Sequence, residues 1–287
     1  MLKGTIIKNI SNHYTVLANN KMYICTPRGK FRKVGLTPLV GDKVTIDENN
    51  NYILDIDERK NFLLRPSVSN VDIMLIVTAL KNPSLSLLLL DKEISLSFLN
   101  KIEPVICFTK IDLLDIKELE EYNDICKYYK KIGIKVFDNR DVKDIIKYLK
   151  GKKVVLTGQS GAGKSSLLNK IDSSLNIKTD EISYALNRGK HTTRHTEIFN
   201  IEGINIFDTP GFSSLSFTGY SIEKIKESFP EFKSISCRYE DCNHEKEDDC
   251  EVKKAVKEGT IKLSRYENYL KIIGECKDGN IRFISKK

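Results

Sequence analysis

Apolar and polar residues alternate in short runs along the first 65 residues of this 287-residue chain. The alternation has a period of two and predicts five strands, separated by Asn, Pro and Gly residues that favour turns. The predicted strands lie at residues 5–8, 13–18, 21–26, 43–47 and 52–56. Five strands in so short a segment predict a small β-barrel. An OB-fold is the commonest such barrel that is also basic, and an SH3-like barrel is the alternative.

A different pattern begins at Val71. Continuous apolar runs predict strands that are buried on both faces, as in a parallel sheet, at 72–77, 104–108, 153–157 and 204–207. Between them, helical patterns occur at 88–100, 116–132 and 142–149, with a short strand at 135–137. Strands that alternate with helices predict a doubly wound α/β domain.

Beyond residue 221 the pattern is helical and contains a cluster of cysteines. We therefore predict a multidomain protein with three parts. They are an OB-fold β-barrel at 1–65, an α/β domain at 66–220 and a mostly helical domain at 221–287.

Composition and charge exclude several classes of protein and indicate a kind of partner. Hydrophobic residues make up 40% of the chain and charged residues 30%, which argues against wholesale disorder. The longest apolar runs are too short to span a membrane and the first residues do not resemble a signal peptide, so we expect a cytoplasmic protein. The net charge is +8, and the basic surplus lies in residues 1–65 and 251–287. This distribution favours flanks that face a polyanion such as RNA; lysine-rich solvated faces are the alternative.

Residues 158–165 read Gly-Gln-Ser-Gly-Ala-Gly-Lys-Ser, which satisfies the P-loop pattern G-x-x-x-x-G-K-[ST]. The segment follows a predicted strand and opens a predicted helix, as this motif requires. Its glycines let backbone N–H groups surround phosphates, Lys164 reaches the β- and γ-phosphates, and Ser165 binds Mg²⁺. The sequence therefore predicts a nucleotide phosphate site.

Asp208-Thr209-Pro210-Gly211 comes directly after the predicted strand at 204–207. The Asp208 carboxylate at a strand end can hold the Mg²⁺ shell through water. Gly211 can let a backbone N–H turn toward the γ-phosphate.

Thr109-Lys110-Ile111-Asp112 follows the predicted strand at 104–108. Asp112 can accept hydrogen bonds from the N1–H and 2-amino groups of guanine, while the stem of Lys110 packs along the base. Adenine lacks this pair of donors and would leave Asp112 unpaired, which favours GTP over ATP. An ATPase or a small-molecule kinase is the alternative.

The order of these motifs is unusual, because the base-reading segment 109–112 precedes the P-loop. A compact α/β domain with neighbouring termini tolerates circular permutation, so we predict a circularly permuted GTPase domain. In this order the 208–211 segment leads almost directly into the cysteine-bearing part. We hypothesise that the nucleotide state is passed to that part through this short link.

Cys237, Cys242, His244 and Cys250 have the spacing C-x4-C-x-H-x5-C. Three thiolates and one imidazole make the closed donor set of a structural Zn²⁺ site, with no position left for a catalytic water. Seven cysteines without a secretory segment argue against a disulfide framework.

The basic segment 188–195 lies between the P-loop helix and Asp208, where switch I is expected. A threonine there can close over the γ-phosphate and Mg²⁺. Phe212 follows the Asp208–Gly211 motif and cannot orient a water, so His191 or His195 is the nearest polar candidate for that role. A basic loop that merely attracts phosphate is the alternative.

Taken together, these features resemble the ribosome small subunit-dependent GTPase A (RsgA) family of circularly permuted GTPases. The resemblance covers nearly the whole chain, namely the barrel, T-K-x-D before G-Q-S-G-x-G-K-S-S, R-G-x-H-T-T, D-T-P-G-F and the C-x4-C-x-H-x5-C segment. It implies a GTPase that is stimulated by the 30S subunit, acts in late 30S maturation and contacts 16S rRNA through its barrel and zinc domain. We also expect a monomer.

The resemblance also assigns residues. It implies catalytic roles for Lys164, His191 and Thr193, with His191 at the position of the family's proposed catalytic histidine. The implied GTP-binding residues are Thr109, Lys110, Ile111, Asp112, Gly158, Gln159, Ser160, Gly161, Ala162, Gly163, Lys164, Ser165 and Ser166, to which the motif at 208–211 adds Asp208 and Gly211. The implied metal ligands are Cys237, Cys242, His244 and Cys250 for zinc, and Ser165, Thr193 and Asp208 for magnesium.

The sequence departs from the family pattern at two places where the family binds the guanine base. Thr109 replaces the Asn of the general N-K-x-D motif, and Asn139-Arg140-Asp141 stands where a Ser-Ala turn usually supports the base. Both departures predict a lower guanine affinity. Two other functions stay open from the sequence: an RNA-binding module that uses GTP as a conformational ligand with little turnover, and a GTPase of large-subunit assembly.

Overall fold

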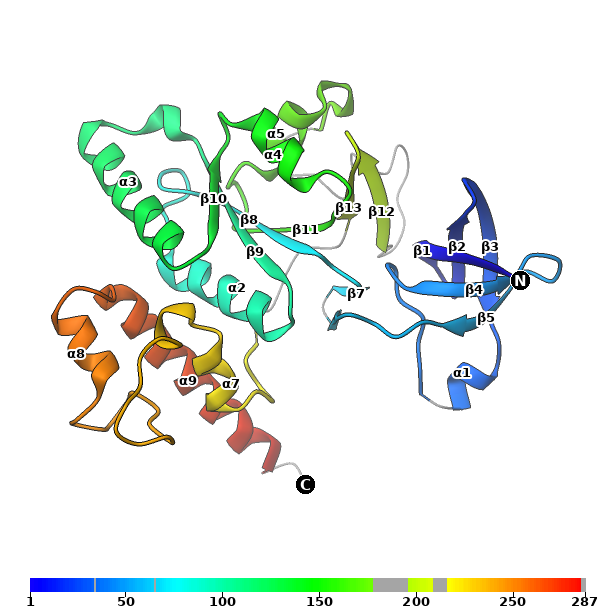
Figure 1. Cartoon of the computed structure of the whole chain (residues 1–287). Coiled ribbons are helices and arrows are strands. Elements are labelled where there is room, and N and C mark those ends of the chain that lie inside the picture. The colour runs from blue at the N-terminus through cyan, green and yellow to red at the C-terminus, as the bar shows by residue number, and fades with distance from the viewer. Residues whose placement is uncertain (34, 65, 178–195, 209–215, 285–287) are drawn as a thin grey trace.

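The computed structural model of the chain describes residues 1–33, 35–64, 66–177, 196–208 and 216–284. Figure 1 shows a barrel at the N-terminal end, a central sheet flanked by helices, and a C-terminal helical part beneath it. This confirms the predicted multidomain fold class; the boundaries at 65/66 and 220/221 stay predictions. Within these ranges, none of the helices has both the length and the apolar character that crossing a membrane requires.

The N-terminal part is a closed five-stranded barrel with OB-fold connectivity. Its strands follow the order β1-β2-β3-β5-β4, and β4 pairs back onto β1. β3 and β5 are parallel, and a short helix lies between β3 and β4. The elements are β1 (Leu2–Ile10), β2 (His13–Ala18), β3 (Lys21–Pro27), α1 (Lys30–Lys33), β4 (Lys43–Asp47) and β5 (Tyr52–Ile56). Alternate side chains such as Ile6, Val16 and Ile46 fill the interior.

The central sheet has five parallel strands in the order β10-β9-β8-β11-β13, with an antiparallel β12 beyond β13. The strands are β8 (Ile73–Ala79), β9 (Glu103–Thr109), β10 (Lys135–Asp138), β11 (Lys153–Thr157), β12 (Thr196–Ile201) and β13 (Ile204–Asp208). Every residue of β8 is buried, which explains its continuous apolar run.

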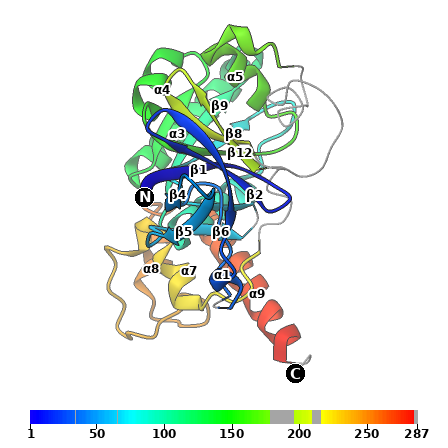
Figure 2. The same cartoon turned by 90° about the vertical axis from the view of Figure 1, so that its right-hand side faces the viewer.

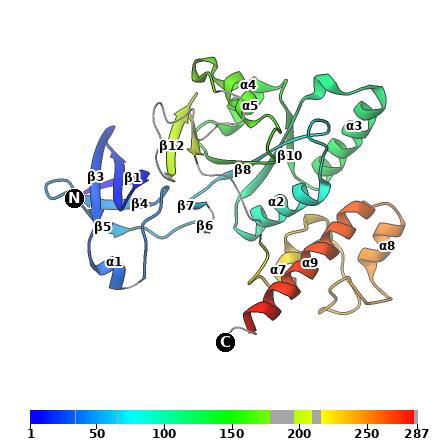
Figure 3. The same ribbon diagram turned by 180° about the vertical axis from the view of Figure 1, so that it is seen from behind.

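Helices cover both faces of this sheet, as a doubly wound domain requires (Figures 1 and 3). α2 (Leu87–Leu99) and α3 (Ile116–Lys131) lie on one face, while α4 (Val142–Leu149) and α5 (Lys164–Ile171) lie on the other. Side chains that alternate along β8 point to the two layers in turn. Short 3-10 turns follow β9 and α5, η1 (Ile111–Leu113) and η2 (Ser173–Leu175).

The barrel and the central sheet form one continuous sheet, because β12 pairs antiparallel with β1 (Figure 2). Lys8 on β1 lies 2.6 Å from the carboxylate of Glu197 on β12. A hairpin of β6 (Phe62–Leu64) and β7 (Ser67–Ser69) links the two parts, and the buried Asp42 binds Arg59 and Ser69 at this junction. The sequence predicted neither β12 nor this hairpin.

The C-terminal part is helical, as the sequence predicts. Its elements are α7 (Ile222–Glu227), η3 (Pro230–Phe232), α8 (Glu251–Lys257) and α9 (Leu263–Ile284). α9 crosses α2 of the central domain (Figures 1 and 3). A separate core of buried aromatic and aliphatic side chains, including Phe229, Tyr269 and Ile272, holds this part together and includes Leu96 of α2.

Candidate functional site

Three of the motifs found in the sequence meet at one edge of the central sheet. β9 ends at Thr109, β11 ends at Thr157 and β13 ends at Asp208. These strands share a parallel sheet with β8 between β9 and β11, so their carboxyl ends lie along the same edge. In open α/β sheets this edge is where ligands bind.

The P-loop takes a backbone conformation that only glycine adopts readily. Gly158 has φ +122°, and a Cβ at this position would lie 1.9 Å from the carbonyl oxygen of Val77 on β8. Gly161 and Gly163 also have positive φ values, +75° and +92°. The chain then enters α5 at Lys164, so backbone N–H groups at the helix start point at the space enclosed by the loop.

The lysine of this loop lies folded against it. The Lys164 ammonium donates to the carbonyl oxygens of Gly158 and Gln159, at 2.7 Å each. Ser165 is buried in the first turn of α5, whereas Ser160, Gly161 and Ser166 are exposed. An ammonium held by neutral carbonyl groups can exchange them for phosphate oxygens, which bind it more strongly.

The base-reading segment contacts the P-loop directly. The Thr109 hydroxyl lies 2.5 Å from the carbonyl oxygen of Ala162 and 3.2 Å from that of Thr78. Lys110 has a left-handed backbone and its ammonium donates to the carbonyl of Asn82. The following Asp112, in η1, is exposed. The structure therefore brings the two motifs together although 45 residues lie between Asp112 and Gly158.

The turn at Asn139–Asp141 lies beside the same site. Arg140 donates to the Asp138 carboxylate through its backbone N–H, Nε and Nη2, at 2.9, 2.9 and 2.7 Å. These bonds lower the pKa of Asp138 against the opposing effect of burial. Lys170 of α5 donates to the Asn139 carbonyl at 3.2 Å, so this turn is linked to the P-loop helix.

Asp208 presents a buried carboxylate at the end of β13. It is 3% exposed, and its Oδ1 has no hydrogen-bond partner among the described residues. Burial, together with the charge of Glu197 opposite on β12, raises the pKa of Asp208 to about 6. A buried acceptor without a partner fits a hydrated cation, and Mg²⁺ prefers such oxygen ligands. Asp208 and Ser165 therefore fit a magnesium ion. His191, Thr193, His195, Gly211 and Phe212 lie outside the described residues.

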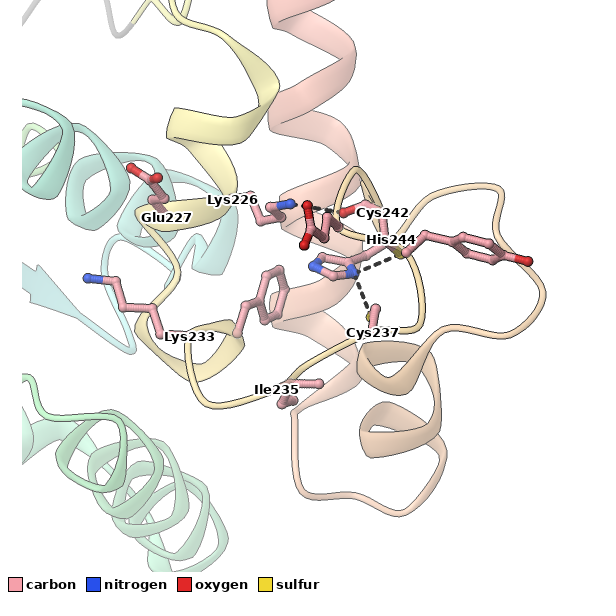
Figure 4. Close-up of a pocket in the computed structure, with 10 residues that line it drawn as sticks. Lys226, Glu227, Lys233, Ile235, Cys237, Cys242 and His244 are labelled. Atoms are coloured by element: carbon pink, nitrogen blue, oxygen red, sulfur yellow. Dashed lines mark hydrogen bonds between the residues drawn. The ribbon is translucent and has the colours of Figure 1, made fainter.

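The four residues predicted to bind zinc converge in the C-terminal part. Figure 4 shows three of them, Cys237, Cys242 and His244. Nδ1 of His244 lies 3.4 to 3.5 Å from the three cysteine sulfurs, and Sγ of Cys237 lies 3.8 Å from that of Cys250. Tetrahedral coordination with Zn–S bonds of about 2.3 Å separates two sulfurs by about 3.8 Å. The cluster therefore has the donor set and the dimensions of a structural zinc site.

Local contacts hold these ligands in place. His244 has a left-handed backbone, and the hydroxyls of Tyr266 and Tyr269 donate to the carbonyls of His244 and Asn243, each at 2.7 Å. Burial lowers the pKa of His244 to about 4, so its imidazole is neutral and can bind a metal. A cavity of about 120 Å³ lies beside the cluster, lined by Lys226, Glu227, Phe232, Lys233, Ile235, Cys237, Tyr239, Glu240, Cys242 and His244 (Figure 4).

Two acidic residues near the nucleotide edge were not predicted from the sequence. Glu197 lies opposite Asp208 in the β12–β13 pair. Glu93 of α2 is buried beneath the P-loop, with its carboxylate 2.6 Å from the Thr157 hydroxyl. The sequence contains only a weak indication that Glu93 is buried. Glu93 shares a helix face with Leu90, Ile94 and Ser97, and an apolar residue is expected on such a face.

Comparison with known families gives matches along most of the chain. Residues 56–218 match the RsgA GTPase family, and residues 3–53 match the RsgA N-terminal domain. A protein of Bacillus velezensis named small ribosomal subunit biogenesis GTPase RsgA is 44% identical, over 99% of this chain and all of that protein. The protein of the same name from Bacillus subtilis is 42% identical over the same shares.

Two solved structures are similar along nearly their whole length. YjeQ from Thermotoga maritima superposes with a TM-score of 0.82 at 34% identity, covering 96% of this chain and 98% of that one. YloQ, described as a circularly permuted GTPase, superposes with a TM-score of 0.81 at 38% identity, covering 97% and 96%. The permuted order of motifs read from the sequence is thus confirmed, and the chain belongs to the RsgA family of GTPases.

Proposed function

We propose that this chain hydrolyses GTP to GDP and phosphate on the small ribosomal subunit, is stimulated by that subunit, and acts in its late maturation. Family membership and the names of the relatives support this function. The observation that carries it is the meeting of Thr109, the P-loop and Asp208 at one sheet edge. We propose further that the protein acts in the cytoplasm, where ribosomal subunits are assembled, and as a monomer.

The base would be read by the 109–112 segment. Asp112 is exposed and its carboxylate accepts hydrogen bonds, so it can pair with the two donors of guanine. The Thr109 hydroxyl fixes this segment against Ala162 of the P-loop. The segments that would recognise the base and the phosphates are therefore joined by a direct hydrogen bond.

The phosphates would be held by the amides of residues 158–166 and by Lys164. In hydrolysis, water attacks the γ-phosphorus and the bond to the β–γ bridging oxygen breaks, which places new negative charge on GDP. Lys164 stabilises this charge once its ammonium moves from the Gly158 and Gln159 carbonyls to the phosphates. Ser165, Thr193 and Asp208 would hold Mg²⁺, which supplies further positive charge to the phosphates. We assign the orientation of the water to His191.

The zinc cluster would hold the C-terminal part in its fold. Cys237, Cys242, His244 and Cys250 fill a tetrahedral site, so the ion is structural. A segment this short gains much of its stability from such an ion.

The barrel and the C-terminal part would contact 16S rRNA. The outer surface of the barrel exposes Met22, Ile24 and Tyr52, and the Arg28 guanidinium lies 5.8 Å from the Tyr52 ring centre. Exposed aromatic and cationic side chains on an OB-fold suit stacked bases and phosphates. We expect binding to rRNA to weaken with salt, with a slope of about 0.7 to 0.9 per neutralised phosphate.

The deciding experiment is steady-state GTP hydrolysis with purified 30S subunits, with 50S subunits and with neither. Stimulation by 30S alone is the expected result. Stimulation by 50S instead would indicate a GTPase of large-subunit assembly. If neither subunit stimulates turnover while GDP and RNA still bind, the chain is an RNA-binding module that uses GTP as a conformational ligand.

A single substitution tests the base assignment. Asp112→Asn replaces one acceptor by an amide donor, which complements the 2-carbonyl of xanthine instead of the 2-amino group of guanine. We expect the preferred nucleotide to change from GTP to XTP. Asp115→Asn, in the helix N-cap three residues later, is the matched control and should leave the preference for GTP unchanged.

A further inference from the structure

Glu93 is a buried carboxylate that the proposed reaction does not use. It lies on α2, is 3% exposed, and faces the start of the P-loop. Its Oε1 accepts a hydrogen bond from the Thr157 hydroxyl at 2.6 Å, and its carboxylate also accepts from the Gly158 backbone N–H. A buried carboxylate is costly unless it has partners, and here both partners belong to the floor of the phosphate site.

Gly158 connects this carboxylate to the P-loop lysine. Its N–H faces Glu93, while its carbonyl oxygen accepts from the Lys164 ammonium at 2.7 Å. Gly158 also lies so close to Val77 that a Cβ at this position would meet the Val77 carbonyl oxygen at 1.9 Å. Consequently, a change at Glu93 acts on the orientation of the Gly158 peptide and on the position of Lys164.

Among the described residues, the groups that act on the Glu93 carboxyl are of known sign. Thr157 of β11 and the Gly158 amide face it as neutral donors, and Lys164 of α5 supplies a positive charge. Burial is the largest effect on this carboxyl and raises the pKa of Glu93 to about 7. When GDP brings further negative charge to Lys164, the ionised form of Glu93 is disfavoured still more.

We propose that Glu93 is a positioning residue of the nucleotide site, which holds the Gly158 peptide from beneath and whose negative charge opposes the phosphates that Lys164 binds. The proposal rests on the proposed nucleotide site. It assigns to α2 a part in setting the affinity for guanine nucleotides, and it makes that affinity depend on the proton of a single buried side chain.

The test is the dissociation constant of Mg²⁺–GDP with the full chain, measured by calorimetry from pH 6 to pH 9. Glu93→Gln removes the charge and keeps an acceptor for Thr157. We expect this variant to bind GDP about tenfold more tightly than wild type at pH 8, where Glu93 is ionised, and about equally at pH 6. The phosphate of GDP also titrates, but equally in both proteins, so the difference between them is the readout. Equal affinities at pH 8, or the same difference at both pH values, would overturn the proposal.

Two controls separate the possible outcomes. Lys92→Ala removes a charge from the same helix, one residue away and paired with Glu275, and should keep the wild-type pH profile. Lys164→Ala should abolish GDP binding; if it does not, the nucleotide site itself is wrongly placed and the proposed function fails. If wild type binds GDP normally and Glu93→Gln binds it with the same affinity at pH 8, the role of Glu93 is refuted. The proposed nucleotide site then still stands.

A second variant covers the case in which Glu93→Gln does not fold. Glu93→Met fills a similar volume without charge, and its affinity relative to that of wild type should likewise rise between pH 6 and pH 8. If neither variant folds, the wild-type profile decides. An affinity that stays flat above pH 7, after allowance for the phosphate of GDP, contradicts the proposal.

Discussion

Arg265 of α9 makes a deeply buried polar contact between the C-terminal part and the GTPase domain. Its guanidinium donates to Asp91 of α2 at 2.6 Å, and to the two carboxylate oxygens of Glu231 at 2.7 and 3.1 Å. The three side chains are 2%, 1% and 5% exposed. The ring of Phe229 covers the guanidinium, with its centre 4.4 Å from the central carbon.

Arg265→Ala would leave two buried carboxylates without their cation. Removing one partner from a buried ion pair costs about 3 to 5 kcal/mol, because the remaining charge stays buried and unpaired. Lys92→Ala is the matched control, since Lys92 pairs with Glu275 between the same two helices at 2.5 Å. The Glu275 side chain is 44% exposed, so loss of that pair should cost no more than about 1 kcal/mol.

The assay is native-state hydrogen exchange of the α9 amides, read by mass spectrometry. Protection there reports the free energy of opening the contact with α2. We expect exchange to accelerate by about a hundredfold or more in Arg265→Ala, and by less than about tenfold in Lys92→Ala. Similar acceleration in the two variants would refute the reasoning, because burial would then not distinguish the two ion pairs.

Three further outcomes follow from the structure. Cys250→Ser should reduce the zinc content below stoichiometric, measured by atomic emission, and should lower helical protection in the C-terminal part while leaving GDP affinity unchanged. Gly158→Ala should abolish GDP binding, since its Cβ would lie 1.9 Å from a carbonyl oxygen; Gly133→Ala, also at positive φ but with open space among the described residues, should cost about 1 kcal/mol in a urea titration. Because the pKa of Glu93 is raised to about 7, wild type should lose about 3 kcal/mol of stability as the pH rises from 4.5 to 7. The urea midpoints of Glu93→Gln at pH 5 and pH 8 should not show this loss.

Much of the fold and the site could be predicted from the sequence, because the relevant signals are local. The buried strands appear as continuous apolar runs. The P-loop is a contiguous motif, and its backbone conformation requires glycine at positions with positive φ. Likewise, the zinc ligands lie within 14 residues of one another. In each case, the residues that determine the structure are close together in the chain.

The parts that could not be predicted depend on pairs of residues that are far apart. Strand β12 is half-exposed along most of its length, and it becomes part of the barrel sheet only through β1, about 190 residues earlier. In α2, the charges of Asp91 and Glu93 are typical of solvated helix positions, although Glu93 shares a face with apolar residues. They are buried because their partners are Arg265, 174 residues later, and Thr157, 64 residues later. No local pattern reports such partners.

Within the residues that the structure describes, helix α2 connects the nucleotide edge of the sheet with the C-terminal part. Asp91 and Glu93 are two positions apart, so they project about 200° apart around the helix, one toward α9 and the other toward the P-loop. If the Arg265 contact holds α2 in place, its loss should displace Glu93 from Gly158 and tighten GDP binding, as we expect for Glu93→Gln. In the Glu93→Gln background, Arg265→Ala should then add little. We expect the two substitutions to depart from additivity in GDP affinity at pH 8 by about 0.5 to 2 kcal/mol. Additive effects would mean that α2 does not transmit the contact.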